Sequence, residues 1–458
     1  MPVTPLQRRQ LLLGAAACWA VPGRAADPGS VQGVWSGFLD ADDPPALLTL
    51  RIASATSAEL VVVGMGALPL ARFEAGAGRI SFATDRPSLR FDGEVDAAGD
   101  LVGTLLRGQQ RIPLSFVPGD LYTEPRMPAL PQGPLNAERL AALRQAAACP
   151  AMGVTWQREG APTRVLVDGR RSVRSDAPVQ PDDRWHLGSV TKNMTATLVA
   201  RFVEQGRLGW GTTLGDLLGA QLPDMHAGYR SLTLPHLLSH HGGLMRDAPP
   251  ASYRGLPAAQ QRLAYARAAL KLPPIAPAGQ AMAYSNADYV VTGLALETLG
   301  NAPWEELMAA HVFGPLGVRR FGFGPPAELD QPQGHRMGAR GLEPVRSDIA
   351  FALGPAGSVH MALGDLAAYL AAHRDRPASF LSAASWERLH TPPFGNGHAL
   401  GWDVSAAGVL SHGGTNGWWK SEVRVDRARR TVTAAVTNVL NRNGQRALLQ
   451  LADAAVGV

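Results

Sequence analysis

The sequence predicts an α+β protein in two parts, and three observations support this prediction. Residues 30–120 carry apolar side chains at alternate positions, which is the pattern of antiparallel strands that bury one face. Residues 136–458 have strand-like runs at both ends and helical patterns between them, which favours one α+β domain whose sheet pairs distant segments. A stretch rich in Pro and Gly separates the two regions. The 458 residues are enough for two domains.

The first 26 residues have the pattern of an export signal. Arg8 and Arg9 precede a short apolar run, Leu11–Val21, and Ala25 or Ala26 suits a cleavage site. The run Arg-Arg-Gln-Leu-Leu resembles a twin-arginine signal, and a Sec-type signal is the alternative. Cys18 follows three Ala residues instead of the Leu that a lipoprotein signal requires. We therefore expect a periplasmic or secreted protein without a lipid anchor.

Residues 27–120 are predicted to form a small antiparallel β domain. Leu48, Leu50 and Ile52 alternate with polar residues, and turn-forming segments such as 76–78 separate successive runs. This pattern predicts a meander, as a small sheet or a barrel closed on one apolar face. We expect a structural or substrate-flanking role, with a barrel that holds an apolar ligand as the alternative. Residues 121–135 are predicted to be a linker.

Residues 136–458 are predicted to form one domain with its strands near both ends. A helix is expected at 136–148, a second helix from Ser189, and a terminal helix at 445–455. The expected strands are 153–158, 163–167, 409–411, 421–425 and 431–436.

Composition excludes several classes of function. The 43 basic residues comprise 3 Lys and 40 Arg, and they are spread along the chain with a net charge of +5, so we expect no nucleic-acid partner. Beyond the leader, Cys149 is the one cysteine, which excludes an intramolecular disulfide and a cysteine metal cluster. After the leader, the longest apolar runs are shorter than the roughly 18 residues that a membrane span needs.

The first motif is a Ser followed three residues later by a Lys. In the stretch 184–206, Ser189 opens a run of apolar residues with helical spacing, and Lys192 lies on the same helical face as Ser189. A serine hydroxyl needs a neighbouring base to become a nucleophile, and Lys serves as that base when burial lowers its pKa. A serine cap with a solvated Lys is the alternative.

Two further motifs carry groups suited to acyl transfer. Tyr284-Ser285-Asn286 supplies a phenol and an amide, and it is the one Tyr-x-Asn sequence in the chain. The run Ser411-His412-Gly413-Gly414-Thr415 lies at the end of a predicted strand, where glycines allow a substrate close to the backbone and an N–H can face an oxyanion. Taken singly, each motif also fits an ordinary loop or strand end.

In this order and spacing, the three motifs resemble those of the serine β-lactamase and penicillin-binding-protein family. Within it, the resemblance is to the group of class C β-lactamases, DD-peptidases, D-aminopeptidases and esterases. The segments that contain or flank the motifs also resemble stretches of this family: WHLGSVTK at 185–192, LTLPHLLSHHGGL at 232–244, PAGQAMAYSNADY at 277–289 and SHGGTNGWW at 411–419. The resemblance covers residues 136–458 and implies a β-lactamase/transpeptidase-like domain, an antiparallel sheet with helices. Residues 27–120 lie outside it.

The resemblance also implies a role for each motif residue. Ser189 is the expected nucleophile that forms an acyl-enzyme, Lys192 the base, and Tyr284 the group that protonates the leaving group or activates water. Asn286 is expected to bind the acyl amide of the substrate and to hold Lys192. The backbone N–H groups of Ser189 and Thr415 are the expected oxyanion hole. No metal or cofactor is implied.

The third motif departs from the family pattern. His412 stands where the usual motif has Lys, Gly413 where it has Thr or Ser, and Gly414 and Thr415 complete the expected substrate-binding edge. A titratable imidazole and a missing hydroxyl are expected to weaken binding of a β-lactam carboxylate. Arg424 or another nearby Arg is a candidate replacement for that charge. We therefore expect an exported serine hydrolase acting on an ester, amide or peptide, with a D-amino-acid peptide or small ester favoured.

Alternative functions remain at this point. A class C-like β-lactamase is the alternative enzyme, and a non-catalytic binding or sensor protein on the same fold is the alternative class. The chain has no Gly-x-Ser-x-Gly, which argues against an α/β-hydrolase. His236 and His240 have the spacing of metal ligands but lack the Glu of a His-Glu-x-x-His motif. His240 and His241 are expected instead to cap or order a loop. The expected partner is a small-molecule or peptide substrate, and the oligomeric state stays open.

Overall fold

The computed structural model describes residues 31–39, 46–63, 66–122, 135–326 and 330–456. The predicted export signal and residues 123–134 of the predicted linker lie outside this range. The described residues fall into two compact units: the first takes those up to Tyr122 together with Met337–Gly341, and the second takes the rest. No helix in the described ranges is long and apolar enough to span a membrane.

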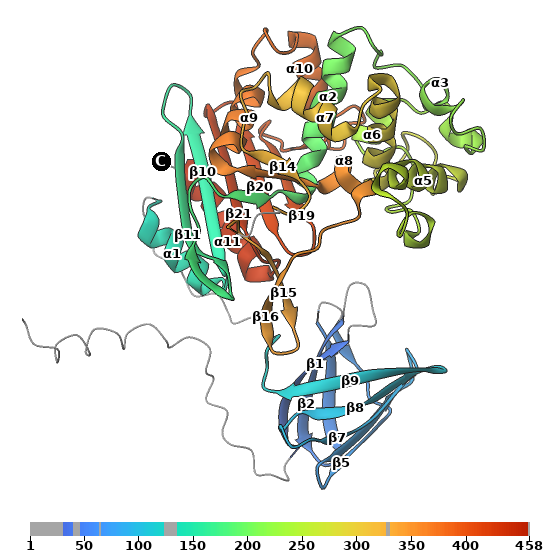
Figure 1. The fold of residues 1–458 in the computed structure, drawn as a ribbon, viewed down its shortest axis with the longest axis vertical. Helices are drawn as coiled ribbons and strands as arrows, with labels where there is room; N and C mark the ends of the chain where they lie inside the picture. The colour runs from blue at the N-terminus through green and yellow to red at the C-terminus, as the bar shows by residue number, and fades with distance from the viewer. Residues whose placement is uncertain (1–30, 40–45, 64–65, 123–134, 327–329, 457–458) are drawn as a thin grey trace, which may run out of the picture. The chain divides into compact units, whose positions relative to one another are not determined.

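The first unit is a nine-stranded antiparallel sheet in the order β4-β3-β2-β1-β9-β8-β7-β6-β5. It curls into a half-barrel whose edge strands are β4 and β5, and its first and last strands pair in the middle (Figure 1). The predicted meander is confirmed. The strands are β1 Gly33–Leu39, β2 Ala46–Ser54, β3 Ser57–Val62, β4 Gly66–Leu68, β5 Arg72–Gly76, β6 Arg79–Thr84, β7 Leu89–Val95, β8 Leu101–Arg107 and β9 Gln110–Pro118.

Aromatic rings fill the buried face of this curled sheet. The ring of Phe91 lies 5.1 Å from that of Phe82 and 5.5 Å from that of Phe116, and all three are buried. Leu48, Leu50 and Ile52 of β2 join the same apolar cluster because alternate side chains of a strand point to one face. These side chains form the apolar core of the first unit.

The second unit is built on a seven-stranded sheet in the order β12-β11-β10-β21-β20-β19-β18. Strand β10, from the start of the unit, pairs antiparallel with β21, from its end, as the sequence predicted. The sheet strands are β10 Ala151–Arg158, β11 Arg164–Ser172, β12 Ser175–Pro178, β18 Asp403–Val404, β19 Leu410–Thr415, β20 Lys420–Asp426 and β21 Thr431–Thr437. Two smaller sheets contain β13 Arg184–His186, β14 Phe321–Phe323, β17 Val359–Ala362, β15 Gly334–Gly338 and β16 Gly341–Val345.

Helices cover both faces of this sheet (Figure 1). Helices α1 Ala137–Ala146 and α11 Arg442–Val456 pack on one face, against Met152, Val154 and Ala435. Helix α9 Leu363–Asp375 packs on the other face, where Val432, Ala434 and Val436 join the main core. The remaining helices are α2 Thr191–Glu204, α3 Leu214–Leu218, α4 Leu234–Leu238, α5 Ala258–Lys271, α6 Asn286–Gly300, α7 Trp304–Met308, α8 Gly354–Gly357 and α10 Ala383–His390.

The boundaries around the motifs differ slightly from the sequence predictions. The helix expected to open at Ser189 begins at Thr191, because Gly188–Val190 forms a separate turn of 3-10 helix. Strand β19 runs through Thr415, so the whole third motif lies within a strand. Helix α2 buries every residue from Thr191 to Ala200, which makes it the central helix of the unit.

Candidate active site

The turn that carries Ser189 lies tightly against strand β19. Gly188 has a φ of +53°, and a Cβ at this position would lie 2.4 Å from the backbone N of Thr415. A Cβ on Gly414 would lie 1.9 Å from the carbonyl oxygen of Leu187 and 3.0 Å from the backbone N of Ser189. Both positions therefore require glycine, because only glycine lets the two backbones approach this closely. The backbone N–H groups of Ser189 and Thr415 border the same junction.

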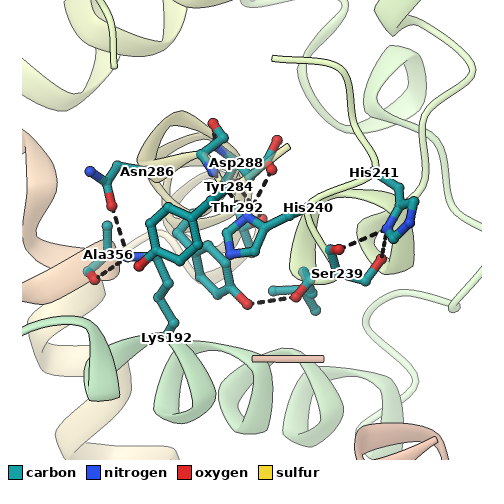
Figure 2. Close-up of polar contacts among 12 residues, drawn as sticks. Lys192, Ser239, His240, His241, Tyr284, Asn286, Asp288, Thr292 and Ala356 are labelled. Carbon is teal, nitrogen blue, oxygen red and sulfur yellow. Dashed lines mark hydrogen bonds and ion pairs between the residues drawn. The ribbon is translucent and has the colours of Figure 1, made fainter. Parts of the chain in front are cut away.

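Lys192 projects from the first turn of α2 into a closed polar site. Its Nζ lies 3.2 Å from Ser189 Oγ. It donates to Asn286 Oδ1 and to the carbonyl oxygen of Ala356, each at 2.8 Å (Figure 2). The side chain is fully buried. In a neutral amine the two N–H bonds satisfy Asn286 and Ala356, and the lone pair then faces the hydroxyl of Ser189.

Burial lowers the pKa of Lys192 to about 7, since a charged amine loses its hydration in this site. Asp247 opposes this shift, Arg246 adds to it, and Asp288 opposes it. The amine therefore loses its proton near neutral pH, as a general base must.

Tyr284 contacts the same serine from the other side. Its hydroxyl donates to Ser189 Oγ at 2.8 Å, and its ring centre lies 4.9 Å from Lys192 Nζ. Burial raises the pKa of this phenol, while the hydrogen bond with Ser189 and the charge of Arg246 lower it in part. The phenol thus keeps its proton at neutral pH and remains available as a proton donor.

Asn286 begins α6 and links the lysine to a loop carboxylate. Its Oδ1 accepts from Lys192, and its Nδ2 donates to Asp247 Oδ1 at 3.0 Å. Asp247 Oδ1 also lies within 3.2 Å of the hydroxyl of Tyr265. The backbone N–H of Asn286 donates to the carbonyl oxygen of Arg246 at 2.8 Å, so the loop 246–247 is tied to the start of α6.

A buried histidine and carboxyl pair backs the phenol. The ring of His240 lies 4.4 Å from that of Tyr284, and its Nδ1 lies 3.1 Å from Asp288 Oδ2 (Figure 2). His240 Nδ1 also accepts the backbone N–H of Ser285 at 3.2 Å, so the proton of the pair belongs to the carboxyl. Burial accordingly raises the pKa of Asp288 well above its usual value and lowers that of His240. The ring of His240 is therefore uncharged at pH 7.

The structure corrects the expectation that His412 provides a titratable charge near pH 7. His412 is buried, its Nδ1 lies 2.8 Å from the carbonyl oxygen of Gly413, and burial lowers its pKa to about 4. It is therefore neutral at pH 7 and supplies no cation. A Cβ on Gly413 would lie 2.8 Å from Lys420 Nζ and 2.9 Å from Glu422 Oε1, so the missing side chain makes room for an ion pair.

The suggested replacement charge at Arg424 is also corrected. Arg424 pairs with Asp453 on α11, on the sheet face opposite to His412, because it stands one residue from Val423, the β20 partner of His412. Arg246 instead lies at the site, with its guanidinium carbon 5.6 Å from the ring centre of Tyr284. It is the nearby arginine that the sequence left unnamed.

Sequence reasoning missed several residues that shape this site. Arg246 and Asp247 follow the family-like run 232–244, but they belong to none of the three motifs. Ala356 contributes a backbone carbonyl, and a backbone group cannot be recognised from residue type. His236 and His240 face different partners, since His236 Nδ1 lies 2.8 Å from Thr233 Oγ1. Within the described ranges, no group of three or more His, Cys, Asp or Glu side chains is arranged to hold a metal ion.

Comparisons with known proteins identify the family and the fold. The sequence model of the Beta-lactamase family matches residues 137–457. Penicillin-binding protein 4 of Amycolatopsis lactamdurans is 27% identical over 285 aligned positions, and the match covers 57% of this chain and 73% of that protein. The solved structure of EstCE1, a hydrolase with promiscuous acyltransferase activity, gives a TM-score of 0.60 at 22% identity, covering 70% of this chain and 98% of the other. D-amino acid amidase from Ochrobactrum anthropi SV3 gives 0.56 at 16% identity, covering 69% and 96%.

The chain belongs to the β-lactamase family, because the family match spans most of its length. It is a serine hydrolase of that family, and the predicted β-lactamase/transpeptidase-like fold is confirmed. The N-terminal half-barrel lies outside the matched residues.

Proposed function

We propose that this chain is an exported serine hydrolase that cleaves an ester, amide or peptide through an acyl-enzyme on Ser189. The observation that carries the proposal is that Ser189 Oγ contacts both Lys192 Nζ, at 3.2 Å, and the hydroxyl of Tyr284, at 2.8 Å. A base and a proton donor thus meet at one hydroxyl, which is the arrangement that nucleophilic catalysis by serine needs.

In the proposed acylation, neutral Lys192 takes the proton of Ser189 as Oγ attacks the substrate carbonyl carbon. The electron pair of the carbonyl moves to its oxygen, which receives hydrogen bonds from the backbone N–H groups of Ser189 and Thr415. The intermediate then expels the leaving group, which takes a proton from Tyr284, and the proton held by Lys192 restores the phenol. The net transfer is one proton from serine to leaving group.

In the proposed deacylation, a water molecule gives its proton to the Lys192 and Tyr284 pair and attacks the acyl carbon. The acid is released, and Ser189 Oγ regains a proton from the same pair. Asn286 holds the lysine and is placed to contact the acyl part of the substrate.

We favour a D-amino-acid peptide or amide, or a small ester, as the substrate. Neutral His412 offers no charge to the carboxylate of a β-lactam. The fold is shared with an enzyme named as a D-amino acid amidase and with a hydrolase that has acyltransferase activity. Nitrocefin hydrolysis is therefore expected to be slow or absent, and rapid turnover would favour the class C-like β-lactamase instead.

Covalent labelling tests the catalytic proposal. Purified protein is incubated with a fluorophosphonate or a labelled penicillin, and the adduct is located by mass spectrometry. We expect it on Ser189 and expect Ser189→Ala to lose it. Ser252→Ala, at an exposed serine of a short turn, is the control that should label normally. A protein that takes no label from any acylating probe and hydrolyses no ester would favour the non-catalytic binding protein.

Export has its own test. Cells expressing the full chain with Arg8→Lys and Arg9→Lys are fractionated beside wild type. Retention of the double variant in the cytoplasm would support twin-arginine export, and equal periplasmic amounts would favour the Sec-type signal.

A further inference from the structure

One carboxylate lies at the exposed edge of the site, and the proposed mechanism does not use it. Asp247 Oδ1 receives hydrogen bonds from Asn286 and Tyr265. Its other oxygen, Oδ2, lies 3.6 Å from Arg246 Nε. The side chains of Asp247 and Arg246 are 39% and 73% exposed. An ion pair this exposed is weak, so Oδ2 is available to another cation.

Two histidines behind this edge carry no charge that could compete with Asp247 for a cation. Burial lowers the pKa of His240 and of His412, so both rings are uncharged at pH 7. Lys192 has its three contacts inside the site and points away from solvent. A substrate that enters therefore meets the carboxylate of Asp247 and the guanidinium of Arg246 at this edge. Asp403, a second carboxylate that acts on Tyr284 and His412, is already paired with His398.

Asp247 is also connected to the nucleophile through a chain of hydrogen bonds. One amide, Asn286, separates it from Lys192, which itself contacts Ser189 Oγ. An ammonium on the carbon next to the carbonyl stands two bonds from the atom that Ser189 attacks. A substrate whose acyl part runs along Asn286 thus directs that ammonium toward Asp247.

We propose that Asp247 selects substrates with a free primary ammonium beside the scissile carbonyl, that is, aminoacyl esters, amides or peptides with an unblocked amino terminus. This inference rests on the proposed acyl-enzyme function and names its substrate class. It assigns Asp247 a specificity role, with the oxygen that faces solvent binding the ammonium while the other oxygen holds Asn286.

A charge series tests the proposal. D-alanine p-nitroanilide, its N-acetyl derivative and its N-succinyl derivative present a cation, a neutral group and an anion at the same position. Each competes with p-nitrophenyl acetate, so an inhibition constant is obtained even where the anilide itself turns over slowly. We expect wild type to prefer the cation over the neutral compound by roughly ten- to a hundredfold, the usual effect of a charge-assisted hydrogen bond, and to bind the anion most weakly.

Asp247→Asn removes the charge and keeps an oxygen that can accept a hydrogen bond from Asn286. The variant therefore tests the preference for a cationic substrate without removing the contact that holds Asn286. We expect the preference for the cation to fall to about twofold or less while hydrolysis of p-nitrophenyl acetate persists. Asp224→Asn is the matched control, an exposed aspartate 3.9 Å from Arg267, and should keep the wild-type order.

The outcomes separate the two proposals. Turnover of p-nitrophenyl acetate that depends on Ser189, with equal binding of the three anilides or preference for the anion, would overturn the role of Asp247 and leave the hydrolase intact. An unchanged order in Asp247→Asn would do the same. No turnover and no label on Ser189 would overturn both.

Discussion

The pH dependence of acylation is expected to follow the protonation of Lys192. Since burial lowers the pKa of Lys192 to about 7, kcat/KM should rise with pH through a midpoint near that value. Two neighbours with opposite charge allow the assignment to be tested. Arg246→Gln removes a positive charge, which should raise the pKa of Lys192 and move the midpoint to higher pH. Asp247→Asn removes a negative charge, which should move it to lower pH.

The size of these shifts can be estimated from the structure. Lys192 Nζ and the guanidinium carbon of Arg246 lie 4.9 and 5.6 Å from the ring centre of Tyr284. The two charges are thus at most about 10 Å apart, where the Coulomb energy is about 0.4–1.7 kcal/mol for an effective dielectric constant between ~80 and ~20. Because Arg246 is exposed to solvent and salt, the lower end applies, which corresponds to a few tenths of a pH unit.

The assay is kcat/KM for a neutral p-nitrophenyl ester from pH 5 to 9, at low salt and again at about 1 M NaCl, where the Debye length of ~3 Å should nearly abolish both shifts. Tyr284 is not expected to contribute near pH 7, because burial raises its pKa. Shifts of the same sign in the two variants, or a wild-type midpoint above pH 9, would refute Lys192 as the base.

Three further substitutions probe the rest of the site. Gly414→Ala places a methyl group 1.9 Å from the carbonyl oxygen of Leu187, so we expect loss of Ser189 labelling and a lower melting temperature, whereas Gly364→Ala, where a Cβ meets nothing within 4 Å, should leave both unchanged. Tyr284→Phe should reduce kcat for amides by about 10²–10⁴ with little change in melting temperature, and a rate close to wild type would exclude the phenol as proton donor. His412→Lys buries a second amine near Lys192, so we expect lower stability without faster nitrocefin hydrolysis; faster hydrolysis would restore the sequence-based view of this position.

The sequence predicted the strands and the contacts of the motif residues better than it predicted the burial of individual side chains. Strand β21 was predictable because apolar and β-branched residues fill both of its buried faces. Strand β2 was predictable because its apolar and polar side chains alternate. The contacts of Ser189, Lys192, Tyr284 and Asn286 follow from motifs whose spacing encodes a shared geometry. The burial of His412 was not predictable, because burial depends on helices and strands that pack against β19 from distant parts of the chain.

Charge is the property that the sequence described least well. The sequence analysis expected a titratable imidazole at His412 and considered Arg424 as a replacement charge. The structure shows a neutral imidazole, and an arginine on the opposite face of the sheet. The charges at the mouth instead come from Arg246 and Asp247, whose importance depends on a loop tied to α6 by backbone hydrogen bonds. Such hydrogen bonds depend on the path of the chain and not on residue type.

The pairing of β10 with β21, and the close approach of Gly188 to Thr415, have a consequence for biosynthesis. The ribosome makes the turn that bears Ser189 long before it makes the strands that complete the pocket around it. A nascent or truncated chain therefore lacks half of the junction that would hold an oxyanion. The hydrolase activity should therefore appear only after β21 has left the ribosome and paired with β10. Until then, an unfinished polypeptide should not act on esters and peptides inside the cell that makes it.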